Sequence, residues 1–268
     1  MPAVPSDSQA ERPRYPVATT TADFKRSLAE VRSRIAAAAQ RANRSAAEVR
    51  LLPVSKTVPE NRLRLAVAAG CTELGENKVQ EAKRKHANLI DLDVAWSVIG
   101  HLQTNKARDV AGFAAEFQAL DSVRVAEALD RRLQAAGRSL DVFVQVNTSA
   151  EDSKYGLPPE QVPSFLAGLA PYTALRVRGL MTLALFSSDV DRVRACFVRL
   201  RTIRDRIRET DPDLIGPGEL SMGMSGDYEV AVEEGATCVR VGQAIFGART
   251  LDEKHYWPSP DGVRPPGP

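Results

Sequence analysis

The stretch LLPVSKTVP, residues 51–59, joins an apolar run to the start of an amphipathic segment. A short apolar run bounded by polar residues and proline predicts a buried strand, and Pro59 suits the start of a helix. If the strand belongs to an α/β fold, Lys56 lies at its carboxyl end, where such folds place their sites. Lys56 is then either a Schiff-base amine or a solvated lysine, and this stretch alone favours the second.

Short apolar runs alternate with helical patterns from residue 49 onward. The pattern predicts strands at 49–55, 72–75, 94–99, 115–120, 141–147, 175–180, 218–221 and 237–241. It predicts helices at 60–70, 77–88, 103–111, 122–137, 159–168, 189–209, 227–235 and 243–247. Eight strand–helix units in about 200 residues predict an α/β fold, a single-domain TIM-type (β/α)8 barrel. An open doubly wound sheet also fits the alternation, but no GxGxxG follows the first strand.

The ends of the chain differ in composition from the barrel segment. Residues 1–21, rich in proline and small polar residues, are expected to form a disordered tail. Apolar residues at helical spacing predict an extra N-terminal helix from Asp23 to Ala47, so the barrel domain is assigned to 22–250. Residues 251–268 are expected to form a proline-rich C-terminal tail.

Composition narrows the function classes. The 268 residues are 43% hydrophobic and carry a formal charge of +2, so neither nucleic acid nor an anionic membrane is expected as the main partner. There is no apolar run of membrane-spanning length and no signal-peptide core, and three widely spaced cysteines fit a reducing cytoplasm. The absence of HxH, HExxH and CxxC motifs gives no case for a metal site.

The loop MGMSGD, residues 222–227, lies directly before a predicted helix. Ser225 and Gly226 therefore fall at a helix N-terminus, where amides and a hydroxyl suit a phosphate group. Gly242 and Gln243 open the next predicted helix and supply further amides. Each feature alone is equally well a helix cap and tight turn, but barrels often bind phosphate between these last two loops, which favours binding. Met222 is counted with the site, although methionines in such loops more often pack than bind.

Arg240 alternates with two valines in VRVGQAIFG. If the valines face the outer helices, the arginine projects into the barrel mouth; the alternative is a structural arginine paired with an internal carboxylate. His101 follows the third strand, and a lone histidine is more often structural than catalytic. A strand-end lysine, a phosphate cup and an inward arginine together suggest pyridoxal 5′-phosphate.

Several motifs resemble those of the pyridoxal phosphate homeostasis proteins, which are barrels similar to the N-terminal domain of alanine racemase. The motifs, in chain order from about residue 22 to 250, are VSKT, GENKVQE, IGHLQTNK, DS, VNTSAEDSKYGL, GLMT, LSMGMSGDYEVAVEEGAT and VRVGQAIFGAR. The resemblance implies that Lys56 forms the Schiff base, that Asn77 lies beside the cofactor and that Arg240 faces the pyridine nitrogen. It also implies that Ser225, Gly226, Gly242 and Gln243 hold the phosphate, while His101, Asn147 and Lys154 are candidate pocket or transfer residues. The chain departs from the family pattern at Val58, Lys78 and Gln243.

The expected function is that of a carrier. A cationic arginine at the pyridine nitrogen disfavours its protonation, so carbanion chemistry is weaker, and the chain ends before a second domain with a tyrosine base. We therefore expect storage, delivery or buffering of pyridoxal phosphate with little or no turnover, apo-enzymes as partners, and a monomer in preference to a homodimer. The alternatives are a pyridoxal phosphate-dependent racemase or decarboxylase with a base from another subunit, and a Schiff-base aldolase without cofactor.

Overall fold

Eight parallel strands with helices between them form a nearly closed barrel in the computed structural model, which describes residues 15–149, 151 and 155–248. The strands are β1 (Arg50–Pro53), β2 (Glu73–Glu76), β3 (Ala95–Val98), β4 (Glu116–Leu120), β5 (Leu140–Gln145), β6 (Leu175–Met181), β7 (Glu219–Ser221) and β8 (Cys238–Val241). Their order in the sheet is β1-β8-β7-β6-β5-β4-β3-β2. The predicted TIM-type barrel is thus confirmed.

The two ends of the sheet meet at β1. On one side β1 pairs with β8, and Leu52 lies opposite Arg240. On the other side an isolated bridge joins Val54 to Gly75, and the Ser55 amide donates to the Gly75 carbonyl oxygen over 2.9 Å. The carboxyl ends of β1, β2 and β8 therefore lie together, which is where the sequence places Lys56, Asn77 and Gly242.

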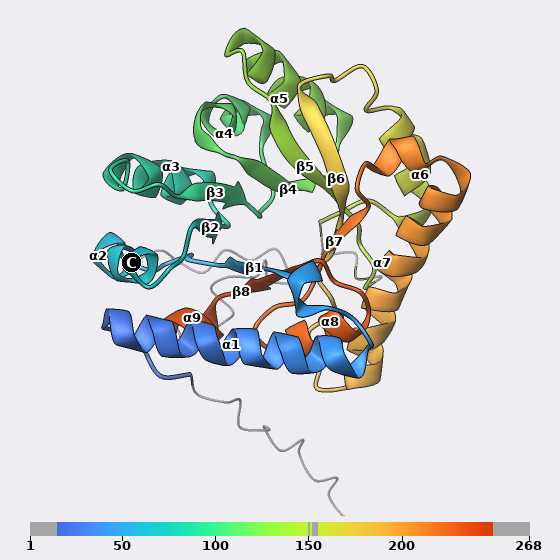
Figure 1. Cartoon of the computed structure of the whole chain (residues 1–268). Coiled ribbons are helices and arrows are strands. Elements are labelled where there is room, and N and C mark those ends of the chain that lie inside the picture. Colours follow the sequence, from blue (N-terminus) through green and yellow to red (C-terminus); the bar gives the residue numbers. More distant parts are fainter. Residues whose placement is uncertain (1–14, 150, 152–154, 249–268) are drawn as a thin grey trace, which may run out of the picture.

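The helices surround the barrel (Figure 1). They are α1 (Thr21–Arg41), α2 (Glu60–Ala68), α3 (Val79–Asn88), α4 (Ala107–Phe113), α5 (Val123–Ala135), α6 (Val162–Ala167), α7 (Val190–Thr210), α8 (Tyr228–Glu233) and α9 (Gln243–Phe246). Short 3₁₀ turns are η1 (Ala46–Glu48), η2 (Thr104–Lys106), η3 (Pro159–Gln161) and η4 (Pro212–Ile215). Each predicted helix position is occupied.

Helix α1 is the extra N-terminal helix. It begins with a capping box, in which the Asp23 amide donates to the Thr20 hydroxyl and the Asp23 carboxylate accepts from the Thr20 amide. Its buried stripe packs against α2, α8 and α9, which lie beside it in Figure 1. The helix ends at Arg41, earlier than the predicted Ala47, because Asn43 takes a positive φ of 54° that a helix does not continue.

Residues 15–20 pack on the barrel before α1 begins. The Tyr15 hydroxyl donates to the Ser225 carbonyl oxygen over 3.0 Å, the Ala248 amide donates to the Tyr15 carbonyl oxygen, and Ala18 is buried. The tail predicted for residues 1–21 is therefore corrected at its end, because these long-range contacts do not show in local composition. The remainder of that tail, and the tail predicted for 251–268, lie outside the described residues.

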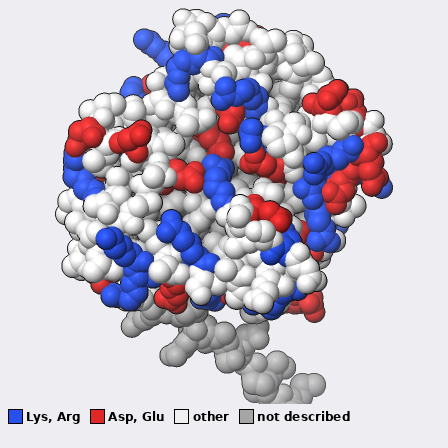
Figure 2. Space-filling model, viewed as in Figure 1, with Lys and Arg blue, Asp and Glu red and all other residues white. Residues whose placement is uncertain are grey.

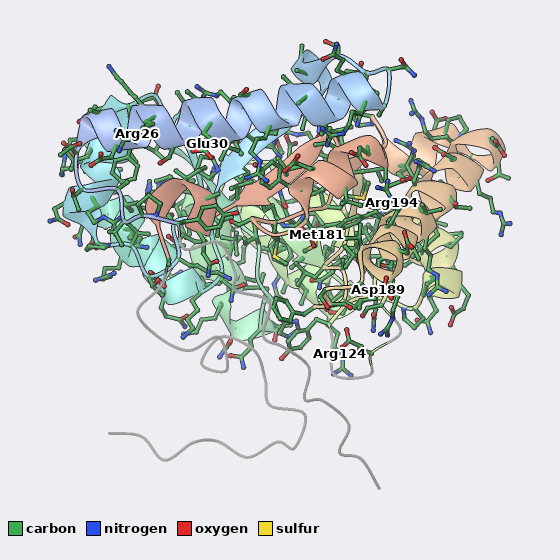
Figure 3. The ribbon with its side chains drawn as sticks, turned by 90° about the horizontal axis from the view of Figure 1, so that it is seen from below. Arg26, Glu30, Arg124, Met181, Asp189 and Arg194 are labelled. Carbon is green, nitrogen blue, oxygen red and sulfur yellow. The ribbon has the colours of Figure 1, made fainter. Side chains whose placement is uncertain are left out.

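Charge and hydrophobicity are distributed as in a globular domain. Basic and acidic side chains are interspersed over the face seen in Figure 2. Met181, at the end of β6, is fully buried near the middle of the molecule, while α1 lies along one side with Arg26 and Glu30 (Figure 3). Within the part of the chain described, no helix has the length and apolar character needed to cross a membrane.

Candidate functional site

Lys56 occupies a tight turn directly after β1. The Val58 amide donates to the Ser55 carbonyl oxygen over 2.9 Å, so residues 55–58 form a β-turn with Lys56 as its second residue. The third residue, Thr57, has a positive φ of 67°. Turns with a positive φ there favour glycine or asparagine, and a β-branched residue in this conformation is an outlier. Lys56 is half-buried, and Val58 is buried in the core.

A buried ionic cluster lies behind this turn, and we call it the Lys85 cluster: Ser55, Glu76, Glu81 and Lys85. The Lys85 ammonium donates to the Ser55 carbonyl oxygen over 2.8 Å and to Glu76 Oε1 and Glu81 Oε1 over 2.7 Å each. Glu81 Oε1 also accepts the Thr57 amide over 2.7 Å. Lys85 and Glu76 are both 0% exposed. The cluster thus bonds to the backbone on both sides of Lys56.

Glu76 is the least compensated member of the cluster. Its Oε1 accepts from the Ser55 hydroxyl over 2.6 Å as well as from Lys85. Its Oε2 is buried and has no hydrogen-bond partner among the described residues. Burial raises the pKa of the Glu76 carboxyl above its usual value, although Lys85 and Ser55 act in the opposite direction. Burial of the Glu76 carboxylate therefore costs free energy, and the hydrogen bonds from Lys85 and Ser55 offset only part of that cost.

Asn77 directly follows β2 and is half-buried. A Cβ atom on Gly100, in the loop after β3, would stand 2.1 Å from the Asn77 carbonyl oxygen. Only glycine therefore allows the loops after β2 and β3 to lie this close. The predicted cofactor residue Asn77 is thus packed tightly between its own strand and the next loop.

Ser225 and Gly242 meet between the last two strands. The Ser225 hydroxyl accepts the Gly242 amide over 3.2 Å and the Ala244 amide over 3.4 Å. Gln243 is the first residue of α9, and an added Cβ on Gly226 would meet no described atom within 4 Å. Two amides therefore point at one hydroxyl oxygen beside an open position, which is an arrangement that suits an anionic oxygen.

Arg240 lies inside the barrel and is 2% exposed. Its Nη1 donates to the Ser221 hydroxyl over 2.6 Å and its Nη2 to the Thr182 carbonyl oxygen over 2.7 Å. Val239 and Val241 belong to the hydrophobic core, as the strand alternation predicts. Burial lowers the pKa of the guanidinium from its usual value. The side chain is thus held rigidly by a hydroxyl and a carbonyl group at the ends of β7 and β6.

A polar chain continues from Arg240 toward the amino ends of the strands. The Ser221 hydroxyl donates to Gln118 Oε1 over 2.7 Å, and Gln118 Nε2 donates to Glu116 Oε1 over 2.6 Å. Arg50 Nη2 then donates to Glu116 Oε2 over 2.6 Å. The interior of this barrel therefore contains a hydrogen-bonded polar network in addition to its apolar layers.

His101 lies on the other half of the rim, after β3. Its ring stacks on that of Tyr155, with centroids 4.0 Å apart and an angle of 11° between the rings. His101 Nδ1 lies 3.5 Å from Asp121 Oδ2. Burial raises the pKa of the Asp121 carboxyl despite the nearby histidine. His101 is thus fixed by a ring and a carboxylate, which suits either a structural or a pocket role.

The other predicted site residues have different surroundings. Asn147 donates from Nδ2 to the Glu151 carbonyl oxygen over 2.9 Å, so it shapes the loop after β5. Met222 is fully buried in the core. Lys154 lies outside the described residues. Among those residues, no group of three or more histidine, cysteine, aspartate or glutamate side chains is arranged to hold a metal ion.

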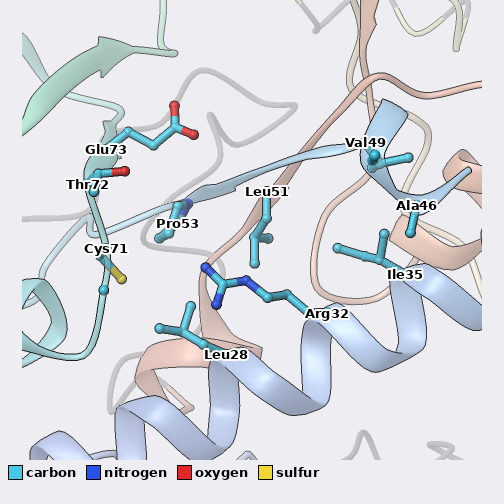
Figure 4. A pocket seen from close by; sticks show the side chains of 12 residues that line it. Leu28, Arg32, Ile35, Ala46, Val49, Leu51, Pro53, Cys71, Thr72 and Glu73 are labelled. Atoms are coloured by element: carbon cyan, nitrogen blue, oxygen red, sulfur yellow. The ribbon is translucent and has the colours of Figure 1, made fainter.

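A separate cavity of ≈ 440 Å³ lies between α1 and the outer side of β1 and β2 (Figure 4). Arg32 extends into it from α1, and Leu28, Leu51 and Cys71 contribute to its walls. Its strand residues are Leu51 and Pro53 of β1 and Glu73 of β2, and it faces α1 on the outside of the barrel. It is therefore distinct from the site at the carboxyl ends of the strands, where the predicted residues gather.

The residues that support the site are ones that the sequence pattern does not single out. Lys85 is the clearest example, because lysines on helices are exposed as a rule. One signal was present: Lys85 continues the spacing of Val79 and Ala82 on the buried face of α3. Glu81 lies four residues before it, which is the favourable spacing for such a pair.

Comparison with known proteins shows which family the chain resembles. A family model described as "Alanine racemase, N-terminal domain" matches residues 27–250. A protein of Pseudomonas aeruginosa named "Pyridoxal phosphate homeostasis protein" is 41% identical over 222 residues, covering 83% of this chain and 94% of the relative. A protein of the same name from Escherichia coli is 38% identical over 239 residues, covering 87% and 99%.

Two solved structures extend the comparison. The structure of PipY from Synechococcus elongatus with PLP bound is 36% identical, has a TM-score of 0.74 and covers 84% of this chain and 100% of that one. Alanine racemase from Streptomyces coelicolor is 20% identical with a TM-score of 0.65, covering 88% of this chain and 61% of that one, and so shares the fold alone. The fold and the matching family model thus define a barrel of the alanine racemase N-terminal-domain class. Within that class, the chain belongs to the family of pyridoxal phosphate homeostasis proteins.

Proposed function

We propose that the chain binds pyridoxal 5′-phosphate at the carboxyl ends of its strands and acts in the cytoplasm in homeostasis of this cofactor. The amine of Lys56 and the cofactor aldehyde join as a Schiff base with loss of water. The observation that carries the proposal is what lies beside Lys56. The strand before it, β1, pairs with β8, and β8 is followed directly by Gly242, whose amide donates to the Ser225 hydroxyl.

The residues at the rim fit the cofactor in chemical terms. The Gly242 and Ala244 amides and the open position at Gly226 suit the phosphate. Asn77 lies on the other side of Lys56, at the end of β2. Arg240 is a rigidly held cation. A guanidinium has donors and no acceptor, so it suits an unprotonated pyridine nitrogen, to which it can donate a hydrogen bond. The relative PipY is described with PLP bound, which supports the same ligand here.

We further propose storage, delivery or buffering with little or no turnover. A bound pyridoxal phosphate is a strong electron sink when its ring nitrogen is protonated, and the cationic Arg240 disfavours that state, so carbanion chemistry is weaker. Tyr228, which lies close to the proposed phosphate loop, is buried, and burial raises its pKa to about 12, so it stays protonated near neutral pH and does not serve as a general base. The names of the relatives, which describe homeostasis, support this interpretation.

The first experiment is an absorbance spectrum of the purified protein incubated with pyridoxal 5′-phosphate. We expect a Schiff-base band in the wild type and in Lys83→Met, a control whose lysine is exposed and paired with Asp109 on the surface. Lys56→Ala should lack the band. Absence of the band in the wild type would refute covalent binding, and steady racemisation or decarboxylation at ordinary enzyme rates would refute the carrier role.

Delivery is tested with a pyridoxal phosphate-dependent apo-enzyme. The loaded protein should restore the activity of the apo-enzyme. In a separate measurement, size-exclusion chromatography of the loaded protein should give the mass of a monomer.

Direct transfer predicts that a phosphatase that removes free pyridoxal phosphate leaves the restored activity of the apo-enzyme unchanged. If the phosphatase abolishes it, the protein only buffers the free cofactor.

A further inference from the structure

The turn that carries Lys56 holds a conformation that its own sequence does not favour. Thr57 has a φ of 67°, a region that β-branched residues avoid. Strained residues of this kind persist only where the surrounding structure determines them, and they gather at functional sites. Something other than local preference therefore holds the turn in place.

The Lys85 cluster supplies that support from both sides of Lys56. On the preceding side, the Lys85 ammonium and the Val58 amide both bond to the Ser55 carbonyl oxygen. On the following side, Glu81 Oε1 accepts the Thr57 amide and so holds the strained residue. The same Glu81 oxygen accepts from Lys85, which links the two contacts through one buried nitrogen.

The desolvation of the Lys85 cluster costs more free energy than a purely structural role would need. Lys85 and Glu76 are completely excluded from solvent, and buried charges must be paired because their desolvation is costly. An apolar residue at position 85 would fit the buried face of α3 with Val79 and Ala82. The three N–H donors of Lys85 are each paired with an acceptor oxygen inside the core, so Lys85 is not an available amine, and Lys56 is the amine that the turn carries.

We propose that Lys85 and Glu81 are positioning residues that fix the backbone on both sides of Lys56 and thereby orient its amine for bond formation with the cofactor aldehyde. This inference rests on the proposed function, since it assigns the support of the same lysine. Neither residue contacts the cofactor directly. Both act through the Ser55 carbonyl group and the Thr57 amide.

The principal test replaces Glu81, which is partly exposed and so tolerates change better than Lys85. Glu81→Ala removes the acceptor for the Thr57 amide, and the rate of Schiff-base formation should fall about tenfold, because misplacing a reacting group is costly. Glu81→Gln keeps an acceptor oxygen and should stay within about threefold of the wild type, since its amide oxygen still reaches the Thr57 amide. Lys83→Met, on the exposed side of the same helix, should leave the rate unchanged.

Rescue by glycine separates positioning from a general loss of stability. Glycine adopts a positive φ without strain, so Thr57→Gly added to Glu81→Ala should restore most of the rate without restoring the lost ion pair. A purely structural role for Glu81 predicts no rescue. If Glu81→Ala folds and forms the Schiff base at the wild-type rate, or if glycine does not restore a reduced rate, the proposal is overturned.

A readout without cofactor keeps the two proposals distinguishable. Amide hydrogen exchange at Thr57 should be at least about tenfold faster in Glu81→Ala than in the wild type, since its hydrogen bond is lost. An unchanged exchange rate overturns the positioning role whether or not pyridoxal phosphate binds. A wild type with no absorbance band, in contrast, refutes the proposed function alone. Lys85→Met should act in the same direction as Glu81→Ala if it folds.

Discussion

Gly226 is the residue whose bare backbone is proposed to lie against the phosphate of the ligand. Its φ lies outside the positive region that strains other residues, and a Cβ there would meet no described atom within 4 Å. Nothing in the packing of the loop therefore requires glycine at this position. The proposed close approach of the phosphate would require it, because glycine alone leaves the backbone uncovered.

We expect Gly226→Ala to keep the free energy of unfolding unchanged or raise it by up to about 1 kcal/mol, since alanine restricts the unfolded chain. The affinity for pyridoxal 5′-phosphate should fall about tenfold or more, which is about 1.4 kcal/mol, because the methyl group occupies space beside the phosphate. Urea unfolding and a binding titration measure the two effects. Gly112→Ala, in α4 and equally free of neighbours, is the control and should affect stability alone. Equal affinity of the two variants would contradict the assigned phosphate position.

Tyr228 carries a second prediction at the residue scale. Its hydroxyl is buried without a hydrogen-bond partner in the described part of the chain, and burial raises its pKa from 10.0 to about 12. Because the folded-state pKa lies above the unfolded value, the stability that this group contributes is fully present below pH 10 and is lost as the pH rises toward 12.

Tyr228→Phe should therefore be at least as stable as the wild type at pH 7, by up to about 1 kcal/mol, because an unsatisfied hydroxyl is removed. Between pH 9 and 12 the wild type should lose stability relative to the variant, by up to about 2 kcal/mol. Urea unfolding at several pH values measures the difference, with the partly exposed Tyr172→Phe as control. A variant that loses stability in parallel with the wild type would show that the phenol does not titrate in this way.

Helix α1 links the N-terminal segment to the end of the barrel where we propose that phosphate binds. Its first buried residue, Phe24, contacts the ring of Phe246 in α9 with centroids 5.6 Å apart and an angle of 65° between the rings. Helix α9 begins at Gln243, directly after Gly242. The amides proposed to bind phosphate are therefore supported by α1 from behind.

Phe24→Leu should lower the free energy of unfolding by about 1 kcal/mol, the size of a lost ring–ring contact and a small cavity. It should also weaken binding of pyridoxal 5′-phosphate about threefold, because α9 becomes less firmly positioned. Ile35→Val, on the same buried stripe but farther from α9 along the helix, should cost about 1 kcal/mol without changing affinity. Thermal unfolding and a binding titration compare the two. An equal loss of affinity in both would mean that stability alone controls binding.

At the scale of the whole molecule, the strand and helix order was predictable because each strand is a separate apolar run between helical patterns. The meeting of the proposed phosphate loops at one rim and the inward position of Arg240 followed from that order, since a barrel brings the carboxyl ends of its strands together. The binding of phosphate by these loops stays a prediction. The Lys85 cluster was not predictable in this way, because its acceptors come from three segments and a helical lysine is expected in solvent. Nor does any local pattern pair Tyr15 with Ser225, which lie 210 residues apart.

The polar network inside the barrel is the other feature that only the closed fold brings together. Glu116 is 7% exposed and accepts hydrogen bonds from Arg50, Ser97 and Gln118, which come from three strands. An interior carboxylate with three donors cannot be replaced by an amide without leaving a donor facing another donor. The cost of such a mismatch is high in an environment that excludes water.

Glu116→Gln should therefore lower the free energy of unfolding by about 2–3 kcal/mol, because charge-assisted bonds are lost and one donor is left unsatisfied. Glu219→Gln makes the same chemical change at a partly exposed pair with Arg178, where the loss should stay below about 1 kcal/mol. Urea unfolding of both variants at pH 7 gives the comparison. If the two lose the same stability, the interior network contributes no more than a surface ion pair, and the barrel is held together by its apolar layers alone.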